Sequence, residues 1–241
     1  AGQHRHAVGL HRDLHAGGWN RTRWVGVELH DKTLGIVGLG RVGVLVAQRA
    51  RAFGMRIIRR DLFLAEERAR QLGVELMPTL EELVQQADFL VLAVPKLPQN
   101  VGMISAELLR HAKPTLRIVN TARGGLVDES ALPEAIADGR VAGAAPDVFD
   151  HEPLTESPLL ALDPVVVTPH LGASTSEAQD KAGQTIAEQV VLPLRGEFVP
   201  FAVNLMASEA NASVQPFMPL AERLGRLFTS LAGGAVDTLE I

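Results

Sequence analysis

The 241-residue chain contains no cysteine at all. It can therefore form no disulfide framework, and it has neither a thiolate nucleophile nor the cysteine ligands of a zinc site. This absence suits a reducing compartment. A signal peptide is also lacking, and the first residue is alanine rather than methionine. We therefore expect a cytoplasmic protein, with a targeting segment lost from the N-terminus as the open alternative.

An excess of basic residues and a long apolar run are missing too. The formal net charge is −5, whereas a surface that binds nucleic acid needs a concentration of lysine and arginine. No apolar run approaches the ~20 residues that span a bilayer. With 46% hydrophobic and 21% charged residues, the composition is that of a soluble globular enzyme. These features predict a small-molecule substrate and neither a nucleic-acid nor a membrane partner.

What the sequence does contain is an alternation of two hydrophobic periods. Branched apolar runs, typical of buried strands, occupy residues 33–39, 55–60, 88–94, 116–121, 141–148 and 165–168. Helical patterns lie between most of them, at residues 41–53, 64–72, 79–87, 105–111 and 129–138. Strands that are apolar on both faces need helices on both sides. The alternation predicts an α/β fold of the Rossmann type, with a doubly wound, mostly parallel sheet and right-handed crossovers.

The turn after the first of these strands carries a glycine motif. Gly38, Gly40 and Gly43 have G-x-G-x-x-G spacing directly behind a strand and at the start of a helix. The first glycine allows a tight turn, the second lets a pyrophosphate approach the backbone, and the third lets the helix pack closely on the strand. The helix N-terminus also favours phosphate, through its free N–H groups and its dipole. The motif predicts dinucleotide binding.

An acidic residue ends the second strand, eighteen residues past the motif's last glycine. Asp61 is placed to accept both hydroxyls of the adenosine ribose and to repel a 2′-phosphate. Arg59 and Arg60 beside it keep NADP open, because arginine accommodates that phosphate. The cofactor prediction is therefore NAD, with NADP as the alternative.

Four further residues fall at the predicted carboxyl ends of later strands. These are Arg123 in "NTARGG", Asp147 and Glu152 in "DVFDHEP", and His170 in "TPHLGAST". Each alone reads as a solvated loop charge, a helix cap or a packed histidine. Ligands of open α/β sheets bind at this edge, so the convergence favours a site.

These blocks resemble the signatures of a known family. "GLGRVG", "VNTARGGLVDESAL", "DVFDHEP" and "TPHLGASTSEAQ" are similar to motifs of the D-isomer-specific 2-hydroxyacid dehydrogenases, and the resemblance covers roughly residues 17 to 205. It implies that Arg123, Glu152 and His170 are the catalytic trio and that Asp147 binds the nicotinamide carboxamide. The glycine motif, Asp61 and the resemblance together give the full set of expected cofactor-binding residues. They are Gly38, Gly40, Arg41, Val42, Gly43, Asp61, Pro95, Thr121, Ala122, Arg123, Asp147, His170 and Gly172.

The chemistry agrees with these implied roles. Oxidising a secondary alcohol needs a base for the hydroxyl proton, and a histidine titrates in the right range. A carboxylate on the other ring nitrogen, here Glu152, favours the protonated form that the reverse reaction needs. Arg123 is always charged and can hold a substrate carboxylate in a fork.

Three features depart from the family pattern or lie outside it. Pro146 stands inside a strand, where it removes a ladder donor, so we expect a bulge and a displaced Asp147. The loop at residues 95–104 is diverged. The N-terminal segment carries four histidines, of which His11 and His15 have i, i+4 spacing; we interpret this segment as a solvated helix and predict no metal site.

The domain organisation follows from the resemblance. We expect residues 1–173 to form the dinucleotide-binding domain, preceded by a linker helix within 1–30. Residues 174–197 should form one crossover helix, capped by Ser174 or Thr175, towards a substrate domain whose N-terminal part is not in this sequence. Residues 198–241 should begin a further domain, with a short strand, a loop and the amphipathic "PLAERLGRLFTSLAGG".

That continuation resembles the extra domain of long-form family members. It favours D-3-phosphoglycerate as the substrate and a homodimer or homotetramer as the assembly. The alternatives are a reductase of glyoxylate or hydroxypyruvate, or another D-2-hydroxyacid dehydrogenase. An alternative of a different class is a dinucleotide-sensing scaffold like the corepressors built on this fold.

Overall fold

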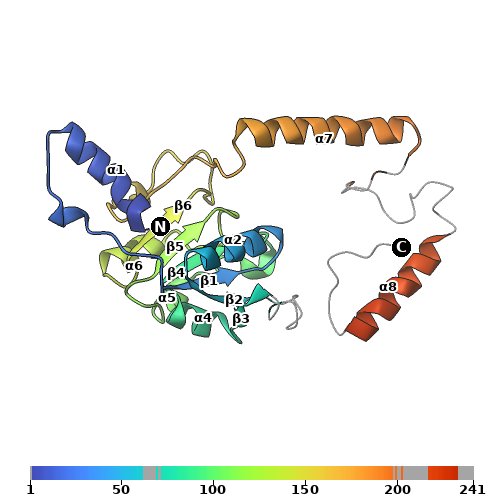
Figure 1. Ribbon diagram of the computed structural model, residues 1–241, viewed down its shortest axis with the longest axis horizontal. Helices are drawn as coiled ribbons and strands as arrows, with labels where there is room; N and C mark the ends of the chain where they lie inside the picture. Colours follow the sequence, from blue (N-terminus) through green and yellow to red (C-terminus); the bar gives the residue numbers. More distant parts are fainter. Residues whose placement is uncertain are drawn as a thin grey trace. The chain divides into compact units, whose positions relative to one another are not determined.

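The computed structural model describes residues 2–61, 69, 72–197, 199, 202 and 217–232. The chain divides into two compact units, Ala1–His170 and Leu171–Ile241. Within the described part of the first unit, six strands form one parallel sheet in the order β3-β2-β1-β4-β5-β6. This doubly wound α/β sheet is the fold that the sequence predicts (Figure 1).

The elements of the first unit alternate as the hydrophobic pattern indicates. In chain order they are α1 (Gly2–His15), η1 (Thr22–Trp24), β1 (Thr33–Val37), α2 (Arg41–Ala52), β2 (Arg56–Arg60), β3 (Glu75–Leu76), α4 (Leu80–Gln86), β4 (Phe89–Leu92), η2 (Pro98–Asn100), α5 (Ala106–Leu109), β5 (Arg117–Asn120), α6 (Ala131–Ala137), β6 (Gly143–Pro146) and η3 (Pro158–Ala161). The second unit contains α7 (Ser176–Leu194) and α8 (Met218–Ala232).

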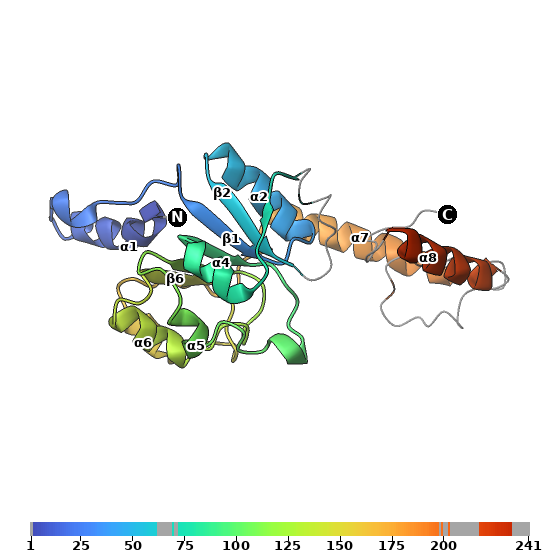
Figure 2. The same cartoon turned by 90° about the horizontal axis from the view of Figure 1, so that it is seen from below.

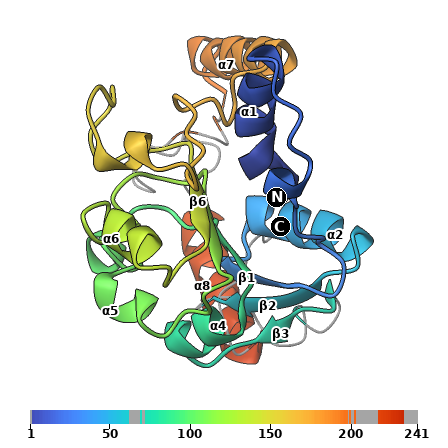
Figure 3. The ribbon, with the colours of Figure 1, turned by 90° about the vertical axis from the view of Figure 1, so that its left-hand side faces the viewer.

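Helices cover both faces of the sheet. Figures 2 and 3 show α2 on one face and α4, α5 and α6 on the other. Leu34 and Ile36 of β1 pack with Ala47 of α2, whereas Val37 belongs to the larger core cluster that α4, α5 and α6 close. Burial on both faces explains why β1 is apolar throughout rather than alternating.

Glycine at position 35 in β1 allows one of these helices to lie close. A Cβ at Gly35 would come within 2.6 Å of the Leu83 side chain in α4. The sheet and α4 can therefore approach more closely than two ordinary side chains permit.

The sequence prediction is wrong at the outer edge of the sheet. Residues 165–168 were expected as a strand, but only Val165 makes an isolated bridge, to Ala144. In β6, Ala144 turns both its N–H and its C=O towards this segment, bonding Pro164 O and Val166 N. Two residues on, Pro146 accepts from Thr168 N but has no N–H to give, so the ladder is interrupted there.

The expected bulge in β6 does not form. Pro146 pairs in register with Asn120 of β5, and the next residue, Asp147, donates its N–H to Asn120 O at 2.8 Å. Parallel strands alternate the side to which each residue bonds. The missing N–H of Pro146 faces outward, so it costs the outer segment a hydrogen bond and leaves Asp147 in place.

The predicted helices agree more closely. The stretches at 41–53, 79–87, 105–111 and 129–138 correspond to α2, α4, α5 and α6. The stretch at 64–72 lies outside the described residues, apart from two positions. No run had predicted the two-residue strand β3, which is too short for an apolar pattern.

In the second unit, α7 confirms the long helix. Thr175, not Ser174, is the cap, since its hydroxyl accepts from Ala178 N. The helix α8 covers most of the amphipathic segment, while the short strand expected before it lies outside the described residues. No helix in the described part of the chain is long and apolar enough to cross a membrane.

Candidate active site

The glycine turn lies at the carboxyl end of β1, and two of its glycines are required by the protein's own packing. Gly38 has φ +87°, and a Cβ there would lie 2.6 Å from Ala93 O, at the end of the neighbouring strand. A Cβ at Gly43 would overlap the carbonyl oxygen of Gly38. These two glycines let the strand turn sharply into α2.

Gly40 is different, because nothing inside the protein requires it. It is exposed, directly before the first turn of α2, and a Cβ there would meet no atom within 4 Å. The absent side chain leaves the backbone N–H groups at the start of α2 open. Arg41 and Val42, in that first turn, are exposed as well. This open cradle at a helix N-terminus fits a pyrophosphate, which is the fit that a dinucleotide demands.

Asp61 stands beside this turn, directly after β2. One carboxylate oxygen accepts the N–H of Leu39 at 2.6 Å, which fixes the carboxylate against the glycine turn. Arg60 is half-buried, and its guanidinium donates to the Asp61 carbonyl at 3.4 Å. Arg59 is fully buried. Of the two arginines that kept NADP open, only Arg60 has surface from which to meet a 2′-phosphate.

The turn after β5 is shaped by a buried amide. Asn120 is 3% exposed; its side chain accepts from Ala122 N at 3.1 Å and donates to Arg123 O at 2.9 Å. The turn leaves Thr121 and Arg123 exposed at the sheet edge. The Arg123 guanidinium donates to the Ala122 carbonyl at 2.6 Å, so its side chain folds back over its own turn.

Asp147 connects the end of β6 to the segment that carries the histidine. It is 5% exposed, and one of its oxygens accepts from the Thr168 hydroxyl. Its carbonyl accepts the N–H of His170 at 2.9 Å. The carboxylate therefore has a fixed position at the sheet edge, where the resemblance expects the carboxamide to bind.

Glu152 and His170 form a direct pair. The Nδ1 of His170 lies 2.7 Å from one carboxylate oxygen of Glu152, and the other oxygen accepts from Phe149 N at 2.9 Å. The bond to His170 is the main reason that the pKa of Glu152 lies below its usual value, and the Phe149 N–H adds to the effect. The carboxylate thus holds the imidazole by Nδ1 and leaves Nε2 as the nitrogen for a substrate proton.

The backbone of His170 is strained. Its φ is +55°, in the left-handed region that residues with a side chain seldom adopt. Two contacts hold it there, since His170 N donates to both Asp147 O and Thr168 O. Such strain persists where surrounding bonds over-determine a position, and it is enriched at functional sites.

The loops of the three expected catalytic residues meet, although the side chains are not all joined. A Cβ at Gly124 would overlap the Phe149 carbonyl, so the turn that carries Arg123 is pressed against the loop that carries Glu152. Lys96, after β4, forms an ion pair of 2.9 Å with Asp150 in that same loop. Pro95 precedes Lys96 in the segment after β4, and its carbonyl accepts a hydrogen bond from the Asn100 side-chain amide.

The remaining expected residues have different places. Ala122 is half-buried within the turn after β5, and Gly172 lies in the second unit, before α7. Within the described residues, no group of three or more histidine, aspartate or glutamate side chains could hold a metal ion. The rings of His11 and His15 on α1 pack edge to face, with centroids 4.3 Å apart.

Sequence reasoning missed Asn120 and Thr168, which shape the site from behind. Each has a visible signal: it is the polar residue that directly follows branched apolar residues at the end of a run, in "RIVN" and in "VVVT". A polar side chain placed where a strand leaves the core must find a partner, and both found one in a loop of the site.

Comparison with known proteins gives one consistent result. Residues 2–172 match the family model described as D-isomer specific 2-hydroxyacid dehydrogenase, NAD binding domain. The D-3-phosphoglycerate dehydrogenase of Mycobacterium tuberculosis is 50% identical over 223 residues, which are 92% of this chain and 41% of that protein. The enzyme of the same name from Methanocaldococcus jannaschii is 46% identical over 230 residues, 95% of this chain and 44% of that protein.

Solved structures agree. The crystal structure of a glyoxylate reductase from Paecilomyes thermophila superposes with a TM-score of 0.71 and 34% identity, covering 78% of this chain and 57% of that one. The chain spans about two fifths of the length of the curated relatives it matches.

Proposed function

Because the chain belongs to the D-isomer specific 2-hydroxyacid dehydrogenase family, we propose that it is the cofactor-binding part of an enzyme that oxidises D-3-phosphoglycerate with NAD. The product is 3-phosphohydroxypyruvate, and the reaction is the first step of L-serine biosynthesis. The observation that carries the proposal is the hydrogen-bonded pair of Glu152 and His170, at the same sheet edge as the open glycine turn.

His170 takes the proton in this reaction. With Nδ1–H donated to Glu152, Nε2 carries the lone pair that accepts the proton of the substrate hydroxyl. The Glu152 carboxylate stabilises the imidazolium that results, and it holds the ring in one tautomer throughout. In the reverse direction the same nitrogen returns the proton to the carbonyl oxygen.

Arg123 binds the substrate. Its guanidinium is exposed at the sheet edge and donates to its neighbour's carbonyl, so it can turn towards a carboxylate without disturbing the core. A fork of N–H donors both anchors that carboxylate and polarises the adjacent oxygen.

The cofactor residues follow from the geometry of the cradle. Bound NAD supplies the acceptor for the hydride of the substrate carbon. The glycine turn and the first turn of α2 would hold its pyrophosphate, Asp61 the ribose hydroxyls and Asp147 the carboxamide. Asp61 needs little rearrangement, because its carboxylate is already fixed beside the turn by Leu39 N.

Two alternatives are weaker. A glyoxylate reductase is favoured by the solved structure of that name, but its identity of 34% falls below the 50% of the mycobacterial relative. A dinucleotide-sensing scaffold would also keep the cradle. Such a scaffold can keep the catalytic trio as well, so turnover of a 2-hydroxy acid is what separates it from an enzyme.

The whole-protein features belong to the same proposal. Residues 1–173 act as the dinucleotide-binding domain, 174–197 as the crossover helix to the substrate domain and 198–241 as the start of an additional domain. The enzyme is a cytoplasmic homodimer or homotetramer.

The test is an assay of NADH formation by the complete enzyme with a panel of 2-hydroxy acids. We expect D-3-phosphoglycerate to be oxidised with the highest kcat/KM. Preference for the glyoxylate or hydroxypyruvate couple would support the reductase alternative. NAD binding without turnover of any panel member would support the scaffold.

A further inference from the structure

The loop that carries Glu152 is held by more than the histidine pair. Its peptide group between Phe149 and Asp150 is fixed at both ends. The Phe149 carbonyl packs against Gly124, and the Asp150 N–H donates to a carboxylate oxygen of Glu129 at 2.7 Å. One residue earlier, the Phe149 N–H donates to Glu152 itself.

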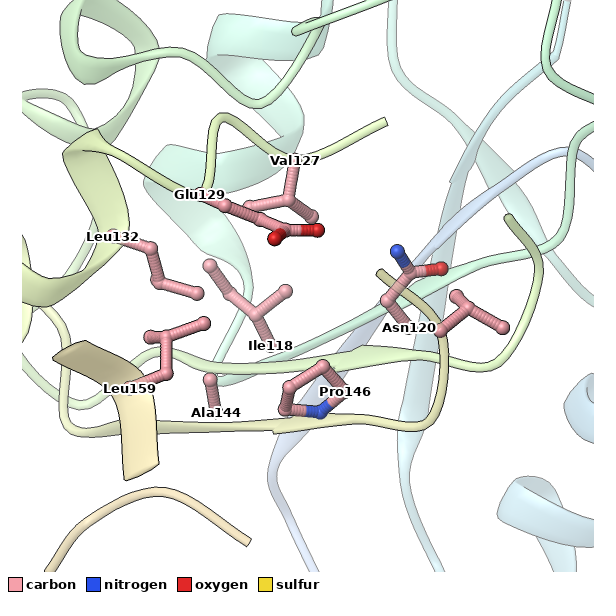
Figure 4. A pocket seen from close by; sticks show the side chains of 9 residues that line it. Ile118, Asn120, Val127, Glu129, Leu132, Ala144, Pro146 and Leu159 are labelled. Atoms are coloured by element: carbon pink, nitrogen blue, oxygen red, sulfur yellow. The ribbon is translucent and has the colours of Figure 1, made fainter. Parts of the chain in front are cut away.

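Glu129 reaches this peptide from outside the loop. It lies in the segment before α6, and its half-buried side chain lines a small, mostly apolar pocket with Val127, Ile118 and Leu132 (Figure 4). Burial raises the pKa of Glu129 above its usual value, and the charge of Asp150 raises it further. A carboxyl group in such surroundings is costly, so its bond to the Asp150 N–H is its main compensation.

Glu129 differs from an ordinary surface glutamate of the same region. Glu134, five residues later on α6, is an ordinary surface glutamate, 74% exposed and ion-paired with Arg140. Glu129 turns inward and bonds the backbone of a different loop. Asp150, whose N–H it holds, is also anchored by its own side chain to Lys96, so the loop is tied to two neighbouring loops.

We propose that Glu129 is a positioning residue for the acid–base pair: it fixes the Phe149–Asp150 peptide, and so places the Glu152 carboxylate on Nδ1 of His170. The inference rests on the proposed function for its catalytic consequence, since only a working acid–base pair needs this precision. The path from Glu129 to His170 runs through the two peptides on either side of Phe149 and then through the Glu152 side chain. Glu129 accepts the Asp150 N–H, and Glu152 accepts the Phe149 N–H and contacts Nδ1 of His170.

The test compares Glu129→Leu with Glu129→Gln and with Glu134→Leu in the 241-residue chain. Leucine removes the acceptor at position 129, while glutamine keeps an oxygen of the same reach. Glu134→Leu makes the same chemical change at an exposed site nearby. Two measurements need no turnover: the ¹⁵N chemical shifts of the His170 ring, which report the nitrogen that carries the proton, and hydrogen exchange of the Asp150 amide.

In the parent and in Glu134→Leu we expect a ring protonated at Nδ1 when neutral and a protected Asp150 amide. In Glu129→Leu the ring should become a mixture of tautomers and the amide should exchange at least tenfold faster. Glu129→Gln should restore both. An unchanged ring and amide in Glu129→Leu would refute the proposal, and so would a ring that changes equally in Glu134→Leu.

The complete enzyme gives a third measurement. If it oxidises a 2-hydroxy acid, Glu129→Leu should lower kcat on the order of tenfold to hundredfold, the effect of displacing a reacting group by about 1 Å. The KM for NAD should change much less than kcat, because the glycine turn and Asp61, which would hold the pyrophosphate and the ribose, lie in other loops. If the ring and the amide of the 241-residue chain change as expected but the complete enzyme oxidises no 2-hydroxy acid, the proposed function is disproved and the positioning contact stands.

Discussion

Replacing Gly124 by alanine tests the contact between the two loops of the site. The added Cβ would overlap the Phe149 carbonyl and lie 2.6 Å from the Asp150 nitrogen. Ordinary contacts of a Cβ begin near 3.4 Å. The Asp150 nitrogen alone requires a movement of about 0.8 Å, and the overlap with the Phe149 carbonyl requires more. Either the loop or the turn after β5 must move, because both partners are backbone.

The magnitude follows from what each movement breaks. A retreat of the loop lengthens the bond from Asp150 N to Glu129 and disturbs the pair of Glu152 with His170. Overpacking of this kind costs about 1–3 kcal/mol. For a chain of this size, 1 kcal/mol corresponds to roughly 2–4 °C in Tm. We therefore expect Gly124→Ala to melt several degrees below the parent, and the complete enzyme to lose on the order of 10²-fold in turnover.

Thermal unfolding followed by circular dichroism measures the effect. Gly183→Ala is the matched control, because Gly183 lies inside α7 and a Cβ there meets no atom within 4 Å. That substitution should leave stability unchanged or raise it by about 0.5–1 kcal/mol. If Gly124→Ala melted within a degree of the parent, the close approach of the two loops would be refuted.

Four further predictions concern single groups. His170→Gln should lower turnover of the complete enzyme by on the order of 10²–10⁴ with NADH affinity near the parental value; a loss below tenfold would remove its proton-transfer role. Asp61→Ala should weaken NAD binding and relatively improve NADP, measured by titrating both, and equal NAD affinity would show that the ribose is held elsewhere. Because the folded-state pKa of Glu152 is lowered, its stabilisation is present above the unfolded value of about 4.3 and is lost as the pH falls through the folded value. Urea unfolding of Glu152→Gln should therefore depend less on pH between 5 and 3 than unfolding of the parent. Pro146→Val should give Val166 O a donor and raise Tm by a few degrees, since one net hydrogen bond is worth about 1 kcal/mol; an unchanged Tm would contradict the interrupted ladder. Calorimetry with NAD should also detect binding by this 241-residue chain, with almost no turnover of 3-phosphoglycerate because positioning by the substrate domain accounts for roughly 7–11 kcal/mol in favourable cases; near-normal turnover would contradict it.

The sheet could be predicted from the sequence because both faces of it are buried. A strand such as β1, with every residue buried, has no choice but to be apolar, and the helices between strands show their own period. The two-residue strand β3 has no such signal, since both of its residues are exposed. Its two residues pair with Ile58 and Arg59 at the edge of β2.

The prediction of a strand at residues 165–168 was wrong because an apolar run describes only one of the two partners in a pair of strands. Three valines favour a strand, but a strand also needs a partner with a complete set of donors and acceptors. That partner is β6, and its proline lies in a different part of the sequence. Local pattern cannot report a hydrogen bond that a distant residue withholds.

For the site, sequence identified the groups that face outward and missed those behind them. Arg123, Glu152 and His170 are polar residues in loops at the carboxyl ends of strands, where the apolar pattern of the fold does not require them. They can therefore be recognised as candidate site residues from the sequence. Asn120 shapes its own turn through bonds to residues two and three positions later, whereas Glu129 bonds the backbone of a loop twenty-one residues away. The contact of Glu129 is decided by the packing of loops that are far apart in sequence, and a local pattern does not encode it.

The proline in β6 also bears on how this molecule meets its own copies. In the described part of the sheet β6 is the last strand, and an unpaired strand edge is a template for aggregation. If residues 165–168 leave that edge, an incoming strand finds a donor at Ala144 and none at Pro146. A strand edge with so few donors is a poor template for pairing with a strand of another molecule. Pro146 therefore weakens the native edge and also protects it from aggregation. A variant such as Pro146→Val should be more stable when folded, and more prone to aggregate when residues 165–168 detach from β6.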